Sequence, residues 1–174
     1  MPELISVLDK DAIARYVADV AKQISDDYRD GDLIIIGVLK GAFVFMADLI
    51  RQLSLKSFTI DFIRIASYGD GVDPAGKVRI VHDIETDIFD KDVLIVDDIY
   101  DTGGTMAFLY RHLQARKPRS IKCCTFVDKT ERRQAALRPD YACYRIDQGF
   151  LVGYGLDYAE AYRHLPGLYK LKCD

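Results

Sequence analysis

Residues 93–106, VLIVDDIYDTGGTM, begin with four apolar residues that run directly into the adjacent carboxylates Asp97 and Asp98. A third carboxylate follows at Asp101, and two glycines and two threonines come next. A short apolar run bounded by turn residues is typical of a strand covered on both faces. The stretch therefore predicts a buried strand, an acidic and glycine-rich loop, and a helix.

The segments around this stretch alternate between helical and strand patterns. Helices are expected over about 9–28, with Asp9 as its cap, over 41–53, and from Met106 onward. Strands are expected over residues 33–38, 58–65, 77–84, 93–96, 121–127 and 141–146, and the tail from Gly149 has no clear pattern. This alternation predicts an α/β fold with a doubly wound, mainly parallel sheet and helices on both faces.

Length and composition favour one globular domain with a sizeable core, residues 1–174. Hydrophobic residues make up 49% of the chain, and the net charge of −3 gives no general attraction to nucleic acid. We expect no signal peptide and no membrane span, because neither a basic start nor an apolar run near ~20 residues is present. None of the four cysteines, Cys123, Cys124, Cys143 and Cys173, forms a CxxC pair, so reduced thiols and a cytoplasmic location are expected.

The end of the quoted stretch has the features of a phosphate site. Residues 101–105, DTGGT, precede a helix, and the backbone amides at a helix start favour an anion. The lysine of a nucleotide-triphosphate P-loop is missing. The carboxylates of Asp97 and Asp98 would repel a phosphate, so they suit sugar hydroxyls or a magnesium ion, and along a strand they would point in opposite directions. A solvated acidic turn is the simpler alternative.

VLIVDDIYDTGGT resembles the phosphoribosyl-pyrophosphate signature of the type I phosphoribosyltransferases. Further segments resemble the branch of that family that acts on hypoxanthine and guanine: Leu39-Lys40-Gly41, Ser67-Tyr68, Val127-Asp128-Lys129, residues 150–154 (FLVGY), residues 156–158 (LDY) and Arg163. The resemblance implies a small hood formed by the terminal segments. It also implies a magnesium-dependent reaction of a 6-oxopurine with phosphoribosyl pyrophosphate, which yields IMP or GMP and pyrophosphate, and a homodimer or homotetramer.

The resemblance implies a role for each matching residue. Asp101 would be the general base at N7 of the purine, and the 5′-phosphate would meet Thr102, Gly103, Gly104 and Thr105. Asp97 and Asp98 would contact ribose and magnesium, and Asp157 a second magnesium. Pyrophosphate would meet Lys40, Gly41 and Arg163, with a cis bond before Lys40 left open. The base would meet Lys129 at O6, Phe150 by stacking and Leu151 through its backbone, in a segment over about 149–165. Ser67 and Tyr68 would head a lid over 67–77.

Two departures from the family pattern and two rival functions remain. Asp97 stands where glutamate is commoner, and Tyr100 where a small aliphatic residue is usual. A phosphoacceptor receiver domain would need an acid pair after its first strand, which LIIIGVLKG does not supply. A non-catalytic regulator that binds nucleotides on the same fold is the stronger alternative, although the negative charge and the base-site residues speak against it.

Overall fold

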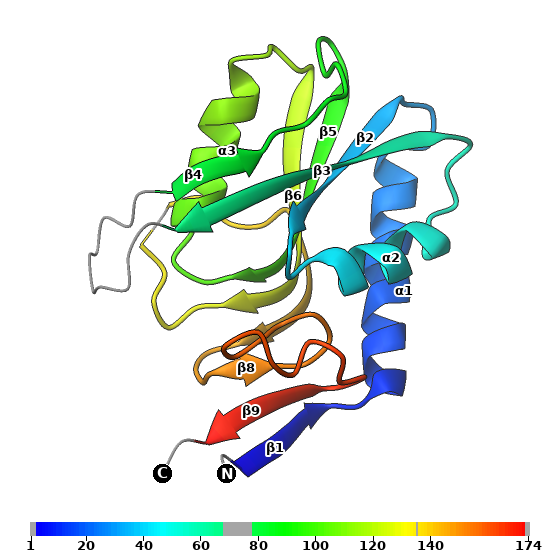
Figure 1. The fold of residues 1–174 in the computed structure, drawn as a ribbon. Helices are drawn as coiled ribbons and strands as arrows, with labels where there is room; N and C mark the ends of the chain where they lie inside the picture. The colour runs from blue at the N-terminus through cyan, green and yellow to red at the C-terminus, as the bar shows by residue number, and fades with distance from the viewer. Residues whose placement is uncertain (1–2, 68–77, 135, 173–174) are drawn as a thin grey trace.

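A mainly parallel sheet forms the centre of the molecule (Figure 1). The structure is a computed structural model and describes residues 3–67, 78–134 and 136–172. Among these residues the sheet has six strands in the order β4-β3-β2-β5-β6-β7. The strands are β2 Leu33–Leu39, β3 Phe58–Ser67, β4 Val78–His82, β5 Asp92–Tyr100, β6 Ser120–Lys129 and β7 Tyr141–Ile146. All neighbours are parallel except β3 and β4. The predicted α/β class is therefore confirmed.

Helices cover both faces of this sheet, as the alternating pattern predicted (Figure 1). The helices α1 (Lys10–Asp27) and α2 (Phe43–Gln52) pack against one face, and α3 (Gly104–Gln114) packs against the other. Within β2, Ile35 belongs to the first core and Ile36 to the second, because successive side chains of a strand point to opposite faces. Asp9 caps α1, where its Oδ1 accepts a hydrogen bond of 2.7 Å from the backbone of Ala12.

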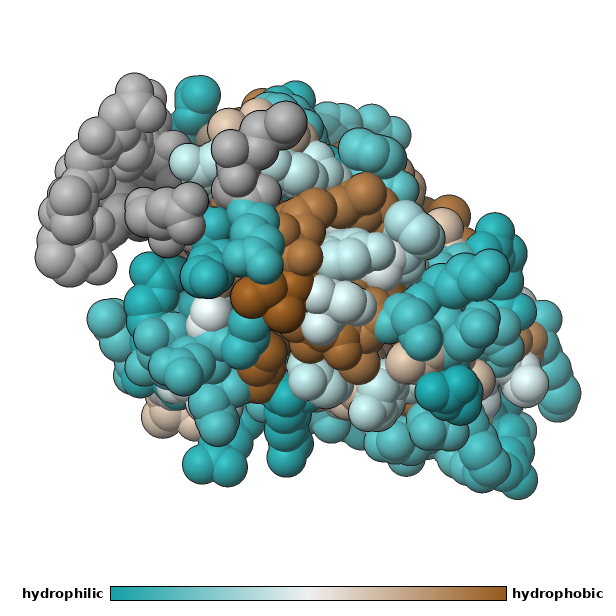
Figure 2. All heavy atoms as spheres, turned by 90° about the horizontal axis from the view of Figure 1, so that it is seen from below, coloured by the Kyte–Doolittle hydropathy of each residue, from teal (hydrophilic) through white to brown (hydrophobic). Residues whose placement is uncertain are grey.

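A second, antiparallel sheet lies beyond the carboxyl ends of the parallel strands and forms the expected hood (Figure 1). It consists of β1 (Glu3–Leu8), β9 (Leu168–Lys172) and β8 (Leu151–Val152), and the pairing of β1 with β9 brings the two terminal strands together. Figure 2 views the molecule from below and shows an apolar band bordered by hydrophilic side chains. In β1, Leu4 and Ile5 are partly exposed apolar side chains.

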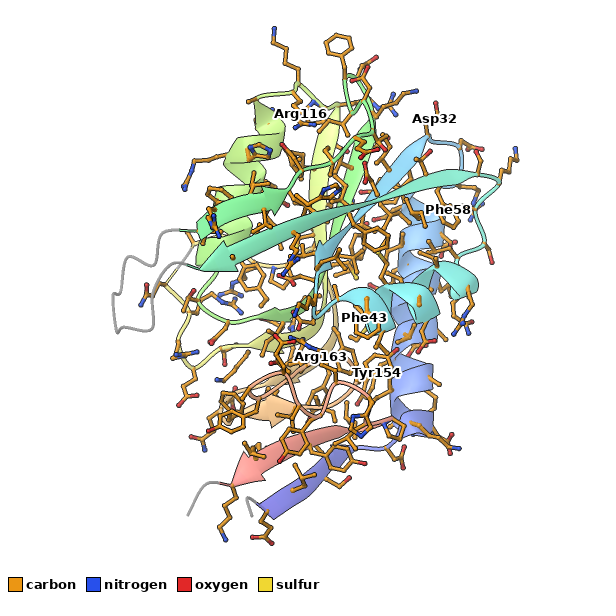
Figure 3. The ribbon with its side chains drawn as sticks, viewed as in Figure 1. Asp32, Phe43, Phe58, Arg116, Tyr154 and Arg163 are labelled. Carbon is orange, nitrogen blue, oxygen red and sulfur yellow. The ribbon has the colours of Figure 1, made fainter. Side chains whose placement is uncertain are left out.

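The register of the strands decides which loops meet below the hood. Gly37 of β2 pairs with Val96 of β5, so the loop after β2 lies beside the acidic end of β5. Tyr100 pairs with Asp128, so the loops after β5 and β6 are also neighbours. Figure 3 shows Arg163 and Phe43 at this end of the sheet and Asp32 at the opposite end. The polar residues of three loops are therefore gathered at the carboxyl edge, where α/β sheets bind ligands.

Several element boundaries differ from those expected from the pattern. The strand β5 continues from Val96 to Tyr100, because its acidic end is still paired with β6. The helix α2 begins at Phe43 rather than at 41, after a turn that follows a cis peptide bond between Leu39 and Lys40. The strands β1, β8 and β9 have no strand pattern in the sequence, and their extended conformation comes from pairing with one another. No helix in the described part of the chain is long and apolar enough to span a bilayer.

Candidate functional site

The glycine-rich loop ends in a left-handed residue that opens the helix α3. Gly103 is the N-cap, with φ of 86°, where a side chain would cost about 1–2 kcal/mol. The backbone amide of Gly104 donates to the hydroxyl of Thr102 over 3.2 Å. The first amides of a helix have no partner within the helix, and they carry the positive end of its dipole. The loop of Thr102, Gly103, Gly104 and Thr105 therefore has the form of an anion cradle.

The two adjacent carboxylates of β5 lie in low-dielectric surroundings. Asp97 is 7% exposed, and burial together with the negative charge of Asp98 raises its pKa well above the usual value. Burial also raises the pKa of Asp98, although the charge of Arg163 acts in the opposite direction. Asp97 accepts a hydrogen bond from the backbone of Asp98, and Asp98 accepts one from Ile99, both 2.9 Å long. Within the described part of the chain neither carboxylate has a salt bridge, so this buried pair favours a cation or hydrogen-bond donors from a ligand.

The loop after β2 is held between this acidic pair and the hood. A Cβ atom at Gly41 would lie 1.8 Å from Oδ2 of Asp98, and a Cβ atom at Gly155 would lie 2.3 Å from the carbonyl oxygen of Gly41. Lys40 reaches outward, where its Nζ pairs with Oε2 of Glu160 at 2.8 Å. The structure thus brings Lys40 and Gly41 to the end of β5, beside Asp98.

Arg163 connects the hood to the acidic end of β5. Its Nη2 pairs with Oδ1 of Asp157 at 2.8 Å, and its Nη1 donates to the carbonyl of Gly155 over 2.8 Å. Its Nε is buried and has no partner among the described residues. Because the charge of Arg163 lowers the pKa of Asp98 against the effect of burial, Arg163, Asp157 and Asp98 belong to one electrostatic cluster.

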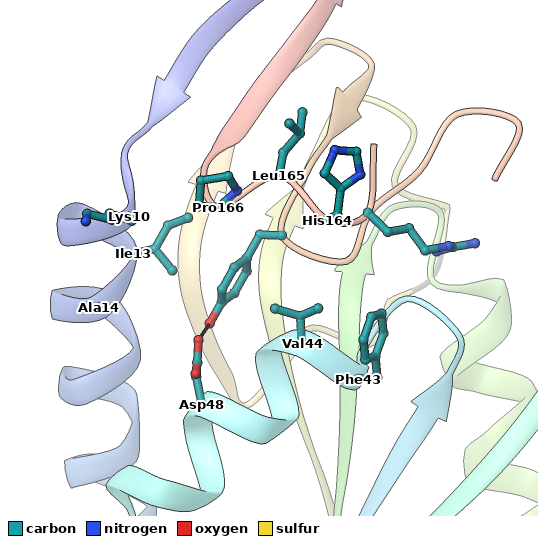
Figure 4. Close-up of a pocket in the computed structure, with 11 residues that line it drawn as sticks. Lys10, Ile13, Ala14, Phe43, Val44, Asp48, His164, Leu165 and Pro166 are labelled. Carbon is teal, nitrogen blue, oxygen red and sulfur yellow. Dashed lines mark hydrogen bonds between the residues drawn. The ribbon is translucent and has the colours of Figure 1, made fainter. Parts of the chain in front are cut away.

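Behind Arg163 lies an apolar cavity of about 500 Å³ that the sequence did not indicate (Figure 4). The helix α2 contributes Phe43 and Val44 to its lining, and the segment between β8 and β9 contributes His164 and Leu165. At its inner end the hydroxyl of Tyr154 donates to Asp48 over 2.6 Å. The cavity therefore lies between α1, α2 and the segment before β9, and Arg163 is one of its lining residues.

Two of the three residues predicted to recognise the base, Lys129 and Phe150, line one open cavity of about 580 Å³. Lys129, at the end of β6, is 7% exposed and lies 3.5 Å from a carboxylate oxygen of Glu131. Phe150 is half exposed, and its ring meets Tyr158 edge-on with 5.5 Å between centroids. Leu151 is buried in β8 and does not itself line the cavity, but it pairs with Lys170, which does.

Asp101 stands between the anion cradle and this cavity. Its Oδ2 forms an ion pair with Arg132, which also lines the cavity, and its Oδ1 is buried without a partner among the described residues. A neighbouring arginine, Arg133, donates to the carbonyl oxygens of both Asp101 and Lys129. The sequence reading missed both arginines, because two charged residues after a strand end usually belong to a solvated loop.

Two of the expectations are not decided by the described residues. Ser67 is the last residue of β3, and residues 68–77, which include Tyr68 and the rest of the expected lid, lie outside the described part. Among described residues there is no group of three or more His, Cys, Asp or Glu side chains that could hold a metal. Asp97, Asp98 and Asp157 remain expected magnesium contacts.

Comparisons with known proteins agree with this geometry. Residues 5–159 match the family model described as the phosphoribosyl transferase domain. The chain is 41% identical over 167 residues to a hypoxanthine-guanine phosphoribosyltransferase of Aquifex aeolicus, covering 95% of this chain and 93% of that protein. It is 39% identical over 174 residues to the hypoxanthine phosphoribosyltransferase of Escherichia coli K12, covering 98% and 97%.

Solved structures of the same group superpose closely. A Bacillus anthracis hypoxanthine-guanine phosphoribosyltransferase with HEPES in its active site gives a TM-score of 0.92 at 38% identity, with 99% of this chain and 100% of that chain covered. A Staphylococcus aureus hypoxanthine phosphoribosyltransferase gives 0.91 at 38% identity, with 96% and 90% covered. The chain therefore belongs to the phosphoribosyltransferase family, in the branch of the hypoxanthine and hypoxanthine-guanine phosphoribosyltransferases.

Proposed function

We propose that the protein is a purine-salvage transferase that joins hypoxanthine or guanine to phosphoribosyl pyrophosphate and releases IMP or GMP and pyrophosphate. One observation carries the proposal. The anion cradle after Gly103, the loop of Gly41 and the cavity of Lys129 and Phe150 meet at one edge of the sheet. Each can take one part of the two substrates, which are a 5′-phosphate, a pyrophosphate and a planar base.

The phosphate and the sugar would bind along β5 and the start of α3. The amides after Gly103 would bind the 5′-phosphate, together with the hydroxyls of Thr102 and Thr105. Asp97 and Asp98 come just before this loop, where their oxygens would accept hydrogen bonds from the ribose hydroxyls. Since burial raises the pKa of both carboxyl groups, hydroxyl donors or a cation would relieve an unfavourable charge pair.

The base would occupy the cavity next to Asp101. The ammonium group of Lys129 would donate to O6, which favours 6-oxopurines over adenine, whose 6-amino group is itself a donor. Phe150 offers an exposed ring for stacking, and Leu151 its backbone. Asp101 would take the proton at N7 as the new bond forms. The ion pair between Asp101 and Arg132 would open when the purine enters.

The leaving pyrophosphate would bind at the opposite side of the sugar. Arg163 would supply a guanidinium, and Lys40 and Gly41 their backbone amides. The carboxylates of Asp97, Asp98 and Asp157 fit magnesium, because this ion prefers oxygen and usually binds one or two carboxylates together with substrate phosphates. When bound, magnesium supplies positive charge that neutralises the pyrophosphate. Residues 67–77 would close over the site and exclude water.

We also propose a homodimer or homotetramer in the cytoplasm. A solved structure of a Trypanosoma cruzi hypoxanthine phosphoribosyl transferase concerns the role of its C-terminal region in oligomeric state and activity. In this chain the C-terminal strand β9 pairs with β1 and β8. A reducing compartment suits Cys123, Cys124 and Cys143, which are buried and free. Light scattering of the purified chain would measure its oligomeric state.

Pyrophosphate release tests the proposed function. The protein is mixed with phosphoribosyl pyrophosphate, magnesium and, in separate reactions, hypoxanthine, guanine, xanthine or adenine. We expect release with hypoxanthine or guanine and little with adenine, and the same assay ranks xanthine. Nucleotide binding without release in any of the four reactions would favour the non-catalytic regulator instead.

A further inference from the structure

Arg133 makes a set of contacts that joins two strand ends of the site. Its guanidinium donates to the carbonyl oxygen of Asp101 over 3.4 Å and to that of Lys129 over 3.2 Å. The same group forms an ion pair with Asp128 and lies 4.7 Å above the centre of the Tyr100 ring. One side chain therefore contacts the backbone of the proposed general base and of the proposed O6 donor.

The two contacted residues belong to different elements. Lys129 ends β6, and Asp101 follows β5, so their spacing depends on how these two strand ends are held. The strands are in register up to the pair of Tyr100 and Asp128, the residues just before Asp101 and Lys129. Beyond that pair, the guanidinium of Arg133 connects the two strand ends by hydrogen bonds, because this planar group presents several donors in fixed directions.

We propose that Arg133 is a positioning residue that sets the distance between the side chains of Asp101 and Lys129. This inference rests on the proposed function, in which these side chains meet N7 and O6 of one purine. N7 and O6 lie on the same edge of the rigid ring, so both contacts form together only if the two strand ends are correctly spaced. A misplacement of ~1 Å can reduce catalysis by ~100-fold.

The surroundings of Arg133 hold its guanidinium in place. Asp128 is 5% exposed, so it is a buried countercharge on the strand side, and the ring of Tyr100 supports the flat face. The hydroxyl of Tyr100 donates to the carbonyl of Leu137 over 2.9 Å, which ties the loop after β6 to the end of β5. Tyr100, where the family pattern has a small aliphatic residue, thus belongs to the same arrangement.

The test is Arg133→Lys in the full-length protein. Lysine keeps a positive charge beside the buried Asp128, but its single ammonium group cannot bridge both carbonyls. We expect the Michaelis constant for hypoxanthine to rise about tenfold and turnover to fall, since one or two hydrogen bonds are lost. The constant for phosphoribosyl pyrophosphate should change by less than about threefold, because the phosphate cradle is not touched.

Arg145→Gln is the matched control. The side chain of Arg145 lies 3.5 Å from the same Asp128 carboxylate, and it is 77% exposed and has no hydrogen bond to Asp101 or Lys129. We expect this variant to have wild-type constants for both substrates. An equal rise for hypoxanthine in Arg145→Gln would mean that the charge on Asp128 matters rather than the bridge, and would overturn the inference.

A double-mutant cycle with Lys129→Ala separates positioning from general damage. If Arg133 acts by placing Lys129, the effect of Arg133→Lys on the hypoxanthine constant should shrink below about threefold once Lys129 is gone. An undiminished effect would show that Arg133 acts elsewhere. If Arg133→Lys folds poorly, the pair Arg133→Gln with Asp128→Asn removes both buried charges, and the same selective purine effect is expected from it.

The failure of this inference differs from the failure of the proposed function. A wild-type protein that releases no pyrophosphate with any base refutes the function, and the inference with it. An active wild-type protein with normal constants in Arg133→Lys refutes only the positioning role. Equal losses toward both substrates, together with a lower melting temperature, would show a purely structural role and would also overturn it.

Discussion

Gly41→Ala is the substitution whose outcome the structure defines most closely. The added Cβ would lie 1.8 Å from Oδ2 and 2.4 Å from Cγ of Asp98, which is far inside any real contact. The loop has little room to retreat, since the carbonyl of Gly41 already touches Gly155, where an ideal Cβ would lie 2.3 Å away. One methyl group therefore has to displace either the carboxylate or the loop.

The magnitude follows from the cost of overpacking. Extra methyl groups in closely packed surroundings cost about 1–3 kcal/mol. For a chain of this size each kcal/mol lowers the melting temperature by about 2–4 °C, so we expect a drop of about 2–12 °C. The loop and Asp98 are also proposed contacts of the pyrophosphate and ribose. The Michaelis constant for phosphoribosyl pyrophosphate should therefore rise about tenfold or more, with a smaller change for hypoxanthine.

Thermal unfolding and steady-state kinetics of four variants test this reasoning: Gly41→Ala, Asp98→Ala, their double variant and Gly104→Ala. Gly104→Ala is the stability control, because its Cβ would meet only the Thr102 hydroxyl at 3.5 Å, and alanine is a better helix former by about 1 kcal/mol. The double variant Gly41→Ala with Asp98→Ala removes the clashing carboxylate. We expect it to melt at or near the temperature of Asp98→Ala alone.

Two results would refute the argument. A Gly41→Ala variant with wild-type melting temperature and kinetics would mean that Asp98 moves aside without cost, and so does not hold the loop. A double variant whose losses equal the sum of the two single losses would show that the alanine and the carboxylate do not interact, because residues in contact give a coupling of about 0.5–3 kcal/mol.

Three further predictions use other residues. Asp101→Asn should lower turnover by about 10²–10⁴-fold, with a melting temperature near wild type, because asparagine keeps the shape but cannot take the proton; a variant with near-normal turnover would remove Asp101 from the chemistry. Thorough chelation should abolish pyrophosphate release and added magnesium restore it, and persisting turnover would contradict the metal assignment. Hydrogen bonds from Arg119 hold the pKa of Asp92 below its usual 3.8, so its carboxylate stabilises the fold above that pH and less as the pH falls through the lowered value. Asp92→Asn should therefore lower the melting temperature by about 1–4 °C at pH 7, with a difference from wild type that shrinks below pH 4.

The parallel sheet and its loops were predictable because their signals are local. Buried strands such as 33–38 and 93–96 are continuous apolar runs, and Ile13, Val17 and Val20 of α1 recur at helical spacing and are buried. The terminal strands were not predictable in this way. In β1 only Leu8 is buried, and the strand depends on pairing with β9 at the far end of the chain, which no local pattern indicates.

The site shows the same division between local and long-range signals. The residue types of the glycine and threonine loop predict an anion cradle, because such a cradle needs small residues at a helix start. The contacts of the arginines with Asp101 cannot be predicted from local sequence, since Arg132 lies 31 residues after Asp101. Only the pairing of β5 with β6 brings them together. Resemblance to a family predicted the residues that would contact the substrates, but not these supporting contacts.

The three acids of residues 93–106 differ in whether the protein itself supplies each of them with a cationic partner. Asp97 and Asp98 share a strand end where burial raises the pKa of both carboxyl groups and the charge of Asp98 further raises that of Asp97, so their environment favours a ligand with hydroxyl donors or a cation. Asp101, three residues on, already has a cation in Arg132, which a purine bound as we propose would have to replace. At the proposed sugar end, neither Asp97 nor Asp98 has a salt bridge within the described part of the chain, while at the proposed base end Oδ2 of Asp101 is paired with Arg132 and its buried Oδ1 has no partner there. A ligand that brings hydroxyl donors or a cation to Asp97 and Asp98 gains free energy, whereas a ligand that breaks the ion pair between Asp101 and Arg132 loses some. Phosphoribosyl pyrophosphate should therefore bind to the free protein more readily than the purine does.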